Sequence, residues 1–164
     1  MRIATAWDRT APVVLVVGDC LDLLRAMPSG AARLVVTSRE KGDLVMLGIG
    51  GFSPLAGFMS RADWSGVCDR MRTADGVFWP IPITLSAPRA FADSVREGAD
   101  IALADPDGGA LLATMTITER YAIDKAHECA SVFRTSDLAH PGVRFVMDQG
   151  DVNLAGPVRV LSTG

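Results

Sequence analysis

The beginning of the chain alternates apolar blocks with short polar breaks. Residues 12–17 form an apolar run that ends at a glycine, a pattern typical of a buried strand. Asp19 follows in a position to cap a helix, and the next apolar side chains recur at helical spacing: Leu21, Leu24 and Met27. A second short strand is predicted over residues 34–36. The pattern therefore indicates a strand–helix–strand extension within residues 1–36.

Two helices are expected on either side of a glycine-rich loop. The first begins with Ser38 as N-cap and places Glu40 and Asp43 in its first turn, where the helix dipole favours acidic side chains. Residues 48–57 contain four glycines and one proline, a composition typical of a loop. The second helix is predicted over residues 60–71, again with a serine as its cap.

Later residues favour strands, followed by two short helices. Residues 79–85 alternate in polarity, but two prolines confine this stretch to a sheet edge or a strand start. An Asp-Pro-Asp-Gly-Gly turn lies between residues 99–104 and 110–118 and predicts a hairpin. In its second strand, threonines at every other position predict one solvent-exposed face and one buried face. The remaining predictions are helices over 125–133 and 141–149 and a closing strand over 158–161.

Composition narrows the class of protein. The 164 residues suffice for one domain, and a hydrophobic share of 49% can supply its core. A formal net charge of -3 argues against a protein whose main task is binding nucleic acid phosphates, since such modules are usually strongly basic. The longest apolar run, residues 11–17, is far shorter than the roughly 20 residues that span a bilayer. We therefore expect neither a nucleic acid partner nor a membrane segment.

The cysteines and histidines show no metal-binding or disulfide pattern. Cys20, Cys68 and Cys129 are odd in number and form no CxxC pair, while His127 and His140 lack the spacing of zinc ligands. Free thiols are typical of proteins in a reducing compartment. The expected location is the cytoplasm.

Candidate catalytic and binding motifs each have a structural explanation. Ser53 stands where a GxGxxG phosphate loop requires its third glycine, and no Gly-Lys-Ser/Thr occurs. His127 and Cys129 lie too close along a helix to face each other as a nucleophile pair. Asp105 and Asp107 belong to a hairpin tip, where aspartate suits turn geometry. These patterns predict no catalytic, cofactor-binding or metal-binding residue.

Residues 37–162 contain an ordered series of distinctive blocks, among them SREKGDL, LGIGGFSPL and WPIPITL. In this order the blocks resemble the amino-terminal domain of ATP sulfurylase (sulfate adenylyltransferase), in the form found in sulfur-metabolising bacteria. The resemblance implies a mixed α/β (α+β) fold, a PUA-like β-pseudobarrel with packed helices. The matching stretches are Thr37–Met59, Ala62–Trp64, Ala74–Leu85, Ala113–Glu119, His140–Val143 and Gln149–Val158.

The same resemblance implies a function without a catalytic centre in this chain. The full family enzyme converts ATP and sulfate to adenosine phosphosulfate and pyrophosphate, with ATP and magnesium bound by a following catalytic domain. That domain carries motifs resembling QxRNP, HxxH and GRDHAG, and none of them occurs here. We expect a truncated, non-catalytic module of this nucleotidyltransferase family with no cofactor of its own. Its expected partner is the catalytic domain of an ATP sulfurylase or a second copy of itself.

A second resemblance covers residues 13–38, which are similar to the opening of a DNA amino-group methyltransferase. Arg39 and Glu40 stand where that family has the Pro-Pro of its catalytic motif, and its glycine motif for S-adenosylmethionine is absent. The two resemblances meet at Thr37-Ser38. We infer a fusion seam there, dividing the chain into a methyltransferase-like extension, residues 1–36, and a sulfurylase-like domain, residues 37–164. Chance similarity within a divergent sulfurylase amino terminus is the alternative.

Two further expectations concern the surface. An RNA-binding PUA-type module is the alternative function, although the acidic balance and a lone tyrosine, Tyr121, count against base stacking. The stretch Gln149–Val160 has few charges and would adjoin the catalytic domain. We expect it to expose an apolar patch around Leu154, through which the isolated chain self-associates.

Overall fold

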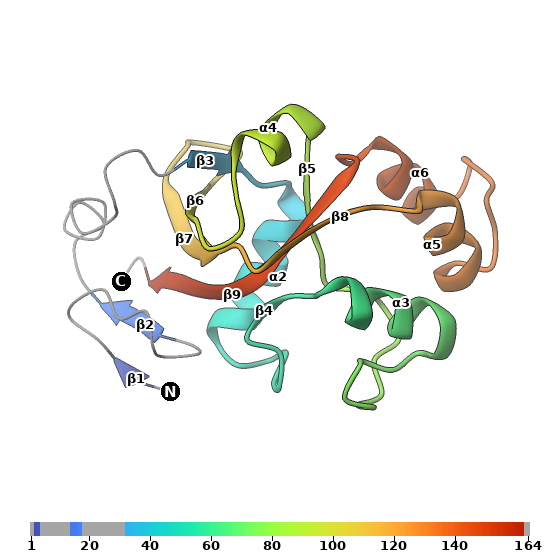
Figure 1. Ribbon diagram of the computed structural model, residues 1–164, viewed down its shortest axis with the longest axis horizontal. Coiled ribbons are helices and arrows are strands. Elements are labelled where there is room, and N and C mark those ends of the chain that lie inside the picture. The colour runs from blue at the N-terminus through green and yellow to red at the C-terminus, as the bar shows by residue number, and fades with distance from the viewer. Residues whose placement is uncertain (1, 4–13, 18–31, 163–164) are drawn as a thin grey trace. The chain divides into compact units, whose positions relative to one another are not determined.

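The computed structural model describes residues 2–3, 14–17 and 32–162 (Figure 1). The expected helix over residues 19–27 and the thiol of Cys20 lie outside the described residues. The helices are α2 (Ser38–Gly48), α3 (Arg61–Arg70), α4 (Arg89–Ser94), α5 (Lys125–Val132) and α6 (Pro141–Asp148). The strands are β1 (Arg2–Ile3), β2 (Val14–Val17), β3 (Ala32–Val35), β4 (Gly57–Phe58), β5 (Leu85–Ala87), β6 (Asp100–Ala104), β7 (Leu111–Thr116), β8 (Glu119–Ala122) and β9 (Val152–Ser162). The expected mixture of helices and strands is confirmed.

Residue contacts divide the chain into two compact units that are interleaved in sequence. The first comprises Met1–Phe58, Val95–Thr118 and Gly156–Gly164, and the second comprises Met59–Ser94 and Glu119–Ala155. These units reflect contacts in the folded chain and carry no information about its ancestry. The proposed seam at Thr37-Ser38 therefore stays a prediction.

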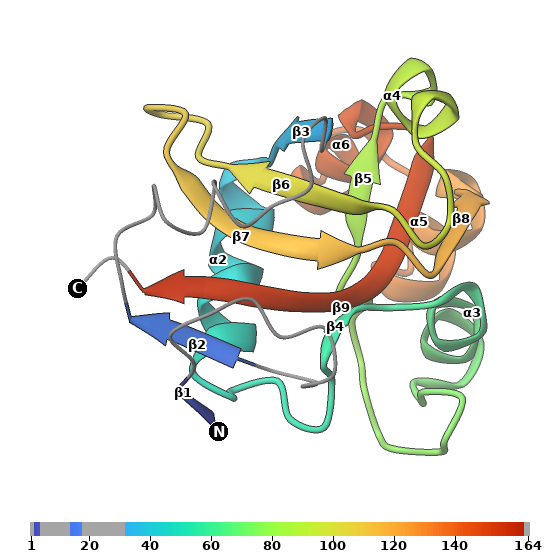
Figure 2. The same ribbon diagram turned by 60° about the vertical axis from the view of Figure 1, so that its left-hand side comes forward.

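The first unit is built on a sheet in the order β1-β2-β9-β7-β6-β3, with β4 pairing β9 as well. Strands β6 and β7 form the predicted antiparallel hairpin, closed by a hydrogen bond from Asp105 N to Ala110 O (2.8 Å). The strands expected near residues 12–17 and 34–36 are confirmed as β2 and β3, which join the sheet parallel to β9 and β6. Helix α2 contacts β7 and covers one face of this sheet (Figure 2).

Helix α2 begins one residue earlier than its sequence predicts. The N-cap is Thr37, whose Oγ1 accepts a hydrogen bond from Glu40 N (3.3 Å), while Thr37 N donates to Glu40 Oε2 (2.7 Å). This reciprocal capping box satisfies the backbone N–H groups of both Thr37 and Glu40. The prediction of Ser38 as the cap was wrong because Glu40 is the N3 partner of Thr37.

The face of β7 that carries the threonines is less exposed to solvent than the alternating sequence pattern predicts. Thr118 is exposed and Thr116 is half-buried, but Thr114 has no exposed surface. Thr114 pairs with Ala102 on one side and Arg159 on the other, and both of these neighbours are buried. A strand in the middle of a sheet can thus be buried on both faces, which the period-2 pattern alone does not reveal.

The second unit surrounds the first half of β9. Strands β5 and β8 pair antiparallel with β9 on its two sides, and both place a residue opposite Leu154, which is completely buried. The expected apolar patch on Gln149–Val160 was therefore wrong: Val152, Ala155 and Val158 are buried as well. Low charge in this stretch reflects a central strand and not a free surface.

The helices of the second unit confirm most of the sequence prediction. Helices α3, α5 and α6 match the expected ranges 60–71, 125–133 and 141–149. Ser60 caps α3 by accepting a hydrogen bond from Asp63 N (3.1 Å). Helix α5 contacts both α3 and α6. Among the described residues, no helix combines the length and apolarity needed to cross a bilayer.

The strand predicted over residues 79–85 was largely wrong. Regular pairing begins only at Leu85, where β5 joins β9, and Phe78 forms an isolated bridge with Arg72. Pro80 and Pro82 lack the backbone N–H that a ladder requires, so the segment remains irregular until both are passed. The short elements α4 and β8 were not predicted.

Candidate functional site

The glycine-rich loop after α2 uses its backbone donors internally. The N–H groups of Ile49, Gly50 and Gly51 donate to carbonyls of α2, at 3.0, 3.2 and 2.8 Å. Those of Ser53 and Leu55 donate to carbonyls within the loop, at 3.1 and 2.8 Å. A phosphate cradle needs such donors free and pointing at the ligand. The loop also follows the carboxyl end of α2, where the helix dipole repels anions. These contacts favour the turn interpretation of this loop.

Two glycines let β9 approach its neighbours closely: Gly57 where β4 meets β9, and Gly156 where β9 meets the end of β7. A Cβ atom on Gly57 would lie 2.0 Å from the carbonyl oxygen of Gly156, and one on Gly156 would lie 1.9 Å from the carbonyl oxygen of Thr116. Neither side chain can be accommodated without moving backbone. The last glycine of the loop is thus required for packing, which agrees with a structural role for the sequence motif.

A lysine and two aspartates join α2 to the hairpin tip. Lys41 Nζ lies 2.7 Å from Asp105 Oδ2 and 3.6 Å from Asp107 Oδ2. Asp105 Oδ1 also accepts a hydrogen bond from Asp107 N (3.0 Å), which confirms its predicted role in the turn. The hydrogen bond from Lys41 holds the pKa of Asp105 below its usual value, and the same bond raises the pKa of Lys41. An ammonium group already bridges these carboxylates, so they do not fit a magnesium site.

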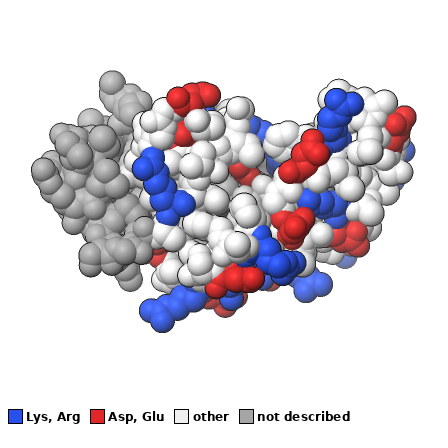
Figure 3. Space-filling view, turned by 90° about the horizontal axis from the view of Figure 1, so that it is seen from above, with Lys and Arg blue, Asp and Glu red and all other residues white. Residues whose placement is uncertain are grey.

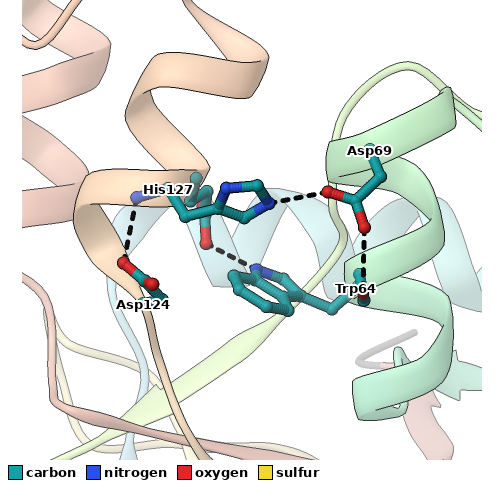
Figure 4. Close-up of polar contacts among 6 residues, drawn as sticks. Trp64, Asp69, Asp124 and His127 are labelled. Atoms are coloured by element: carbon teal, nitrogen blue, oxygen red, sulfur yellow. Dashed lines mark hydrogen bonds and ion pairs between the residues drawn. The ribbon is translucent and has the colours of Figure 1, made fainter.

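A polar cluster joins α3 and α5 in the second unit (Figure 4). His127 Nε2 lies 2.7 Å from Asp69 Oδ1, and Ser65 Oγ donates to Asp69 Oδ2 (3.0 Å). The hydrogen bond with His127 is the main reason why the pKa of Asp69 lies below its ordinary value. Both partners are about two-fifths exposed, with side-chain exposures of 41% and 44%. Solvent therefore screens this pair.

The geometry of this pair does not assemble a nucleophile. Ser65 contacts the carboxylate rather than the imidazole, whereas a general base must reach the hydroxyl it activates. The rings of Trp64 and His127 are arranged edge to face, with their centroids 6.1 Å apart. His127 is exposed, and its contact with Asp69 was not predicted from the sequence. The two residues are 58 positions apart, and no local pattern connects them.

Beneath the pair lies a buried indole with a carboxylate acceptor. Trp64 Nε1 donates to Glu128 Oε2 (2.7 Å), and both residues are buried, with 6% and 3% exposure. Tyr121 packs against the same indole at a centroid distance of 6.1 Å and donates from its hydroxyl to Met59 O (3.1 Å). Burial raises the pKa of this phenol. The aromatic groups are fixed by packing and hydrogen bonds, as expected of a core.

The described thiols are buried and free of disulfides. Cys68 packs with Trp64, and burial raises the pKa of its thiol to about 12. Cys129 packs between α5 and α6, and burial raises its pKa too. A reactive cysteine needs a lowered pKa and access to solvent. These environments do not activate either thiol, in agreement with the sequence interpretation.

Among the described residues, no group of three or more His, Cys, Asp or Glu side chains could hold a metal ion. Figure 3 shows acidic and basic side chains interspersed over the face it draws, unlike the continuous basic strip of a typical nucleic acid groove. The described polar clusters join secondary-structure elements to one another. The expectation that this chain has no nucleic acid partner stays a prediction.

A family comparison agrees with the expected fold. The family described as PUA-like domain matches residues 14–163. This match covers nearly the whole described chain and supports the mixed α/β PUA-like pseudobarrel expected from the sequence.

Curated relatives are sulfate adenylyltransferases that are longer than this chain. The protein from Thiobacillus denitrificans is 52% identical over 151 residues, which are 92% of this chain and 37% of that protein. The one from Chlorobaculum tepidum is 53% identical over 157 residues, 96% of this chain and 39% of that protein. The one from Syntrophobacter fumaroxidans is 62% identical over 128 residues, 77% of this chain and 31% of that protein. The chain thus spans less than two-fifths of the length of these relatives.

A solved structure has a similar fold over most of this chain. It is described as a hexameric APS kinase from Thiobacillus denitrificans, with 31% sequence identity and a TM-score of 0.56. The superposition covers 80% of this chain and 21% of that chain. There too, the matched fold forms a minor part of a larger polypeptide.

Proposed function

Because the chain belongs to the PUA-like domain family, and its curated relatives are sulfate adenylyltransferases, we propose that it is the non-catalytic, amino-terminal PUA-like module of such an enzyme. The observation that carries the proposal is identity above 50% over more than nine-tenths of the chain, to proteins of which it spans 37–39%. In those relatives the greater part of the polypeptide has no counterpart here.

The proposed role is structural. ATP, magnesium and sulfate would be bound by the catalytic part, and this module would pack against that part and stabilise it. Phosphoryl chemistry needs cations or preorganised donors around the phosphate oxygens. The charged side chains of the clusters described above pair with one another: Lys41 pairs with Asp105, and Asp69 pairs with His127. In the glycine-rich loop, backbone N–H groups donate hydrogen bonds to carbonyls of α2 and of the loop itself.

A chimera tests this proposal. The segment of the Thiobacillus denitrificans sulfate adenylyltransferase that matches this chain is replaced by this chain, and ATP formation from adenosine phosphosulfate and pyrophosphate is measured. We expect the chimera to fold and form ATP, and the chain alone to form none above a no-protein control. An unfolded or inactive chimera, or ATP formation by the chain alone, would overturn the proposal.

A further inference from the structure

The loop that joins α3 to β5 exposes a group of large apolar side chains. Phe78 is 63% exposed and Ile81 is 53% exposed, and Val77 and Met71 are exposed as well. Figure 2 shows this loop extending from the end of α3 before the chain returns to β5. Single exposed hydrophobic residues are normal on protein surfaces. Here three of them lie within five residues of one loop, and together with Met71 we call them the patch.

The loop is ordered by its own hydrogen bonds. Thr73 N donates to Val77 O (2.9 Å), and Val77 N donates back to Thr73 Oγ1 (3.1 Å). Gly76 N donates to Thr73 O (2.9 Å), and Arg72 Nη1 donates to Gly76 O (2.9 Å). Arg72 and Phe78 face each other across a β-bridge.

The base of the loop is fixed in the same way. Trp79 N donates to Met71 O (2.8 Å), and Ala74 N donates to Asp63 Oδ1 of α3 (2.9 Å). The backbone therefore holds Met71, Val77 and Phe78 in a fixed geometry, with their side chains exposed. Preorganisation of this kind reduces the entropy lost when a surface is covered by a partner.

The size of the patch favours a tethered partner over a second copy. A stable dimer typically buries about 800 Å² on each partner, from about 20 to 30 residues a side. The patch consists of four side chains: Met71, Val77, Phe78 and Ile81. A partner in the same polypeptide needs far less, because the linker supplies a high effective concentration. The relatives supply such a partner, since most of their length lies outside the segment that matches this chain.

We propose that the loop over residues 71–81 is the surface through which this module docks onto an apolar face of the catalytic part of a sulfate adenylyltransferase, with Phe78 as the anchor. This inference rests on the proposed function and adds the contact surface to it. It also replaces the stretch Gln149–Val160, whose apolar residues are largely buried in the module itself.

The test compares the isolated chain with the chimera described above. Phe78→Asp and Ile81→Asp are introduced into both, with Leu138→Asp as a matched control because Leu138 is 57% exposed outside the loop. Thermal unfolding and ATP formation are measured for each chimera. In the isolated chain, where these side chains face water, we expect all three variants to unfold within about 2 °C of the parent, as surface substitutions usually do.

In the chimera we expect Phe78→Asp and Ile81→Asp to lower the unfolding midpoint by 5 °C or more, because a charge would then be buried at an apolar contact. Leu138→Asp should leave it unchanged. Hydroxyl-radical labelling of Phe78 should fall at least threefold between the isolated chain and the chimera. This second measurement holds even if a variant fails to fold.

Each failure has a distinct meaning. A chimera that fails without any substitution contradicts the proposed function. A working chimera that tolerates Phe78→Asp and leaves Phe78 fully labelled overturns the docking surface alone. A concentration-dependent dimer of the isolated chain that Phe78→Asp abolishes would make a second copy the occupant, and this too overturns the proposal.

Discussion

Gly57→Ala tests whether the glycine-rich loop is built for packing. A Cβ atom at this position would lie 2.0 Å from Gly156 O and 2.8 Å from Pro157 Cα. Carbon atoms of side chains essentially never approach another heavy atom closer than 3.0 Å, so β4 and β9 would have to separate by about 1 Å. Their pairing through Gly57 and Phe58 would then be lost.

The expected cost follows from overpacking. Forcing a methyl group into a filled site costs about 1–3 kcal/mol, and here the obstacle is backbone rather than a flexible side chain. We expect a loss of about 3 kcal/mol, a drop in the unfolding midpoint of roughly 6–12 °C for a chain of this size. Gly42→Ala is the matched control: it lies inside α2 with nothing within 4 Å of its Cβ position.

The control should move in the opposite direction. Alanine is favoured over glycine within a helix by about 0.5–1 kcal/mol, so Gly42→Ala should raise the midpoint. Thermal unfolding followed by circular dichroism measures both variants under the same conditions. If Gly57→Ala unfolds at or above the temperature of the parent, the steric argument is wrong, and the loop glycines would need another explanation.

Four other outcomes are expected. Phe52→Ala should lower the free energy of unfolding in urea by about 1–2 kcal/mol, less than for a fully buried ring, because Phe52 is only half-buried. A loss above about 3 kcal/mol would contradict this. Glu128→Ala should cost about 2–3 kcal/mol, because a buried indole N–H loses its acceptor, whereas the glutamine variant should cost less than half as much. The hydrogen bond with His127 lowers the pKa of Asp69, so the ionised carboxylate stabilises the folded state above about pH 4, and this stabilisation is lost as the pH falls below that value. The free energies of unfolding of the parent and of Asp69→Asn should therefore converge toward about pH 3, and a constant difference between them would refute this. The Cys68 thiol should resist alkylation at pH 8 in the folded chain and react on unfolding, as site-resolved mass spectrometry would show.

Local signals accounted for much of the fold. The hairpin between β6 and β7 was predictable because Asp105–Gly109 combines turn residues with flanking strand patterns. Helix α3 was predictable because Ser60 caps it and apolar residues recur inside it. The cap of α2 was misplaced by one residue because Thr37 and Ser38 are both good caps, and only the partner Glu40 distinguishes them.

Non-local packing accounted for the errors. Leu154 lies in a segment that reads as a free apolar edge, but β5 and β8 cover it from two sides. The contact of Asp69 with His127 joins two helices 58 residues apart, and no periodicity reports it. The segment over residues 79–85 was predicted as a strand because alternation in sequence does not show whether a partner strand exists, and regular pairing begins only at Leu85.

One measurement tests the central claim most directly: the rate of pyrophosphate-dependent ATP formation by the chimera and by this chain alone, at equal concentrations. The account predicts ATP formation by the chimera at a rate within tenfold of the Thiobacillus denitrificans sulfate adenylyltransferase, and none by this chain above a no-protein control. ATP formation by this chain alone would contradict its assignment as a non-catalytic module. A chimera that is folded but inactive would contradict its assignment to this enzyme.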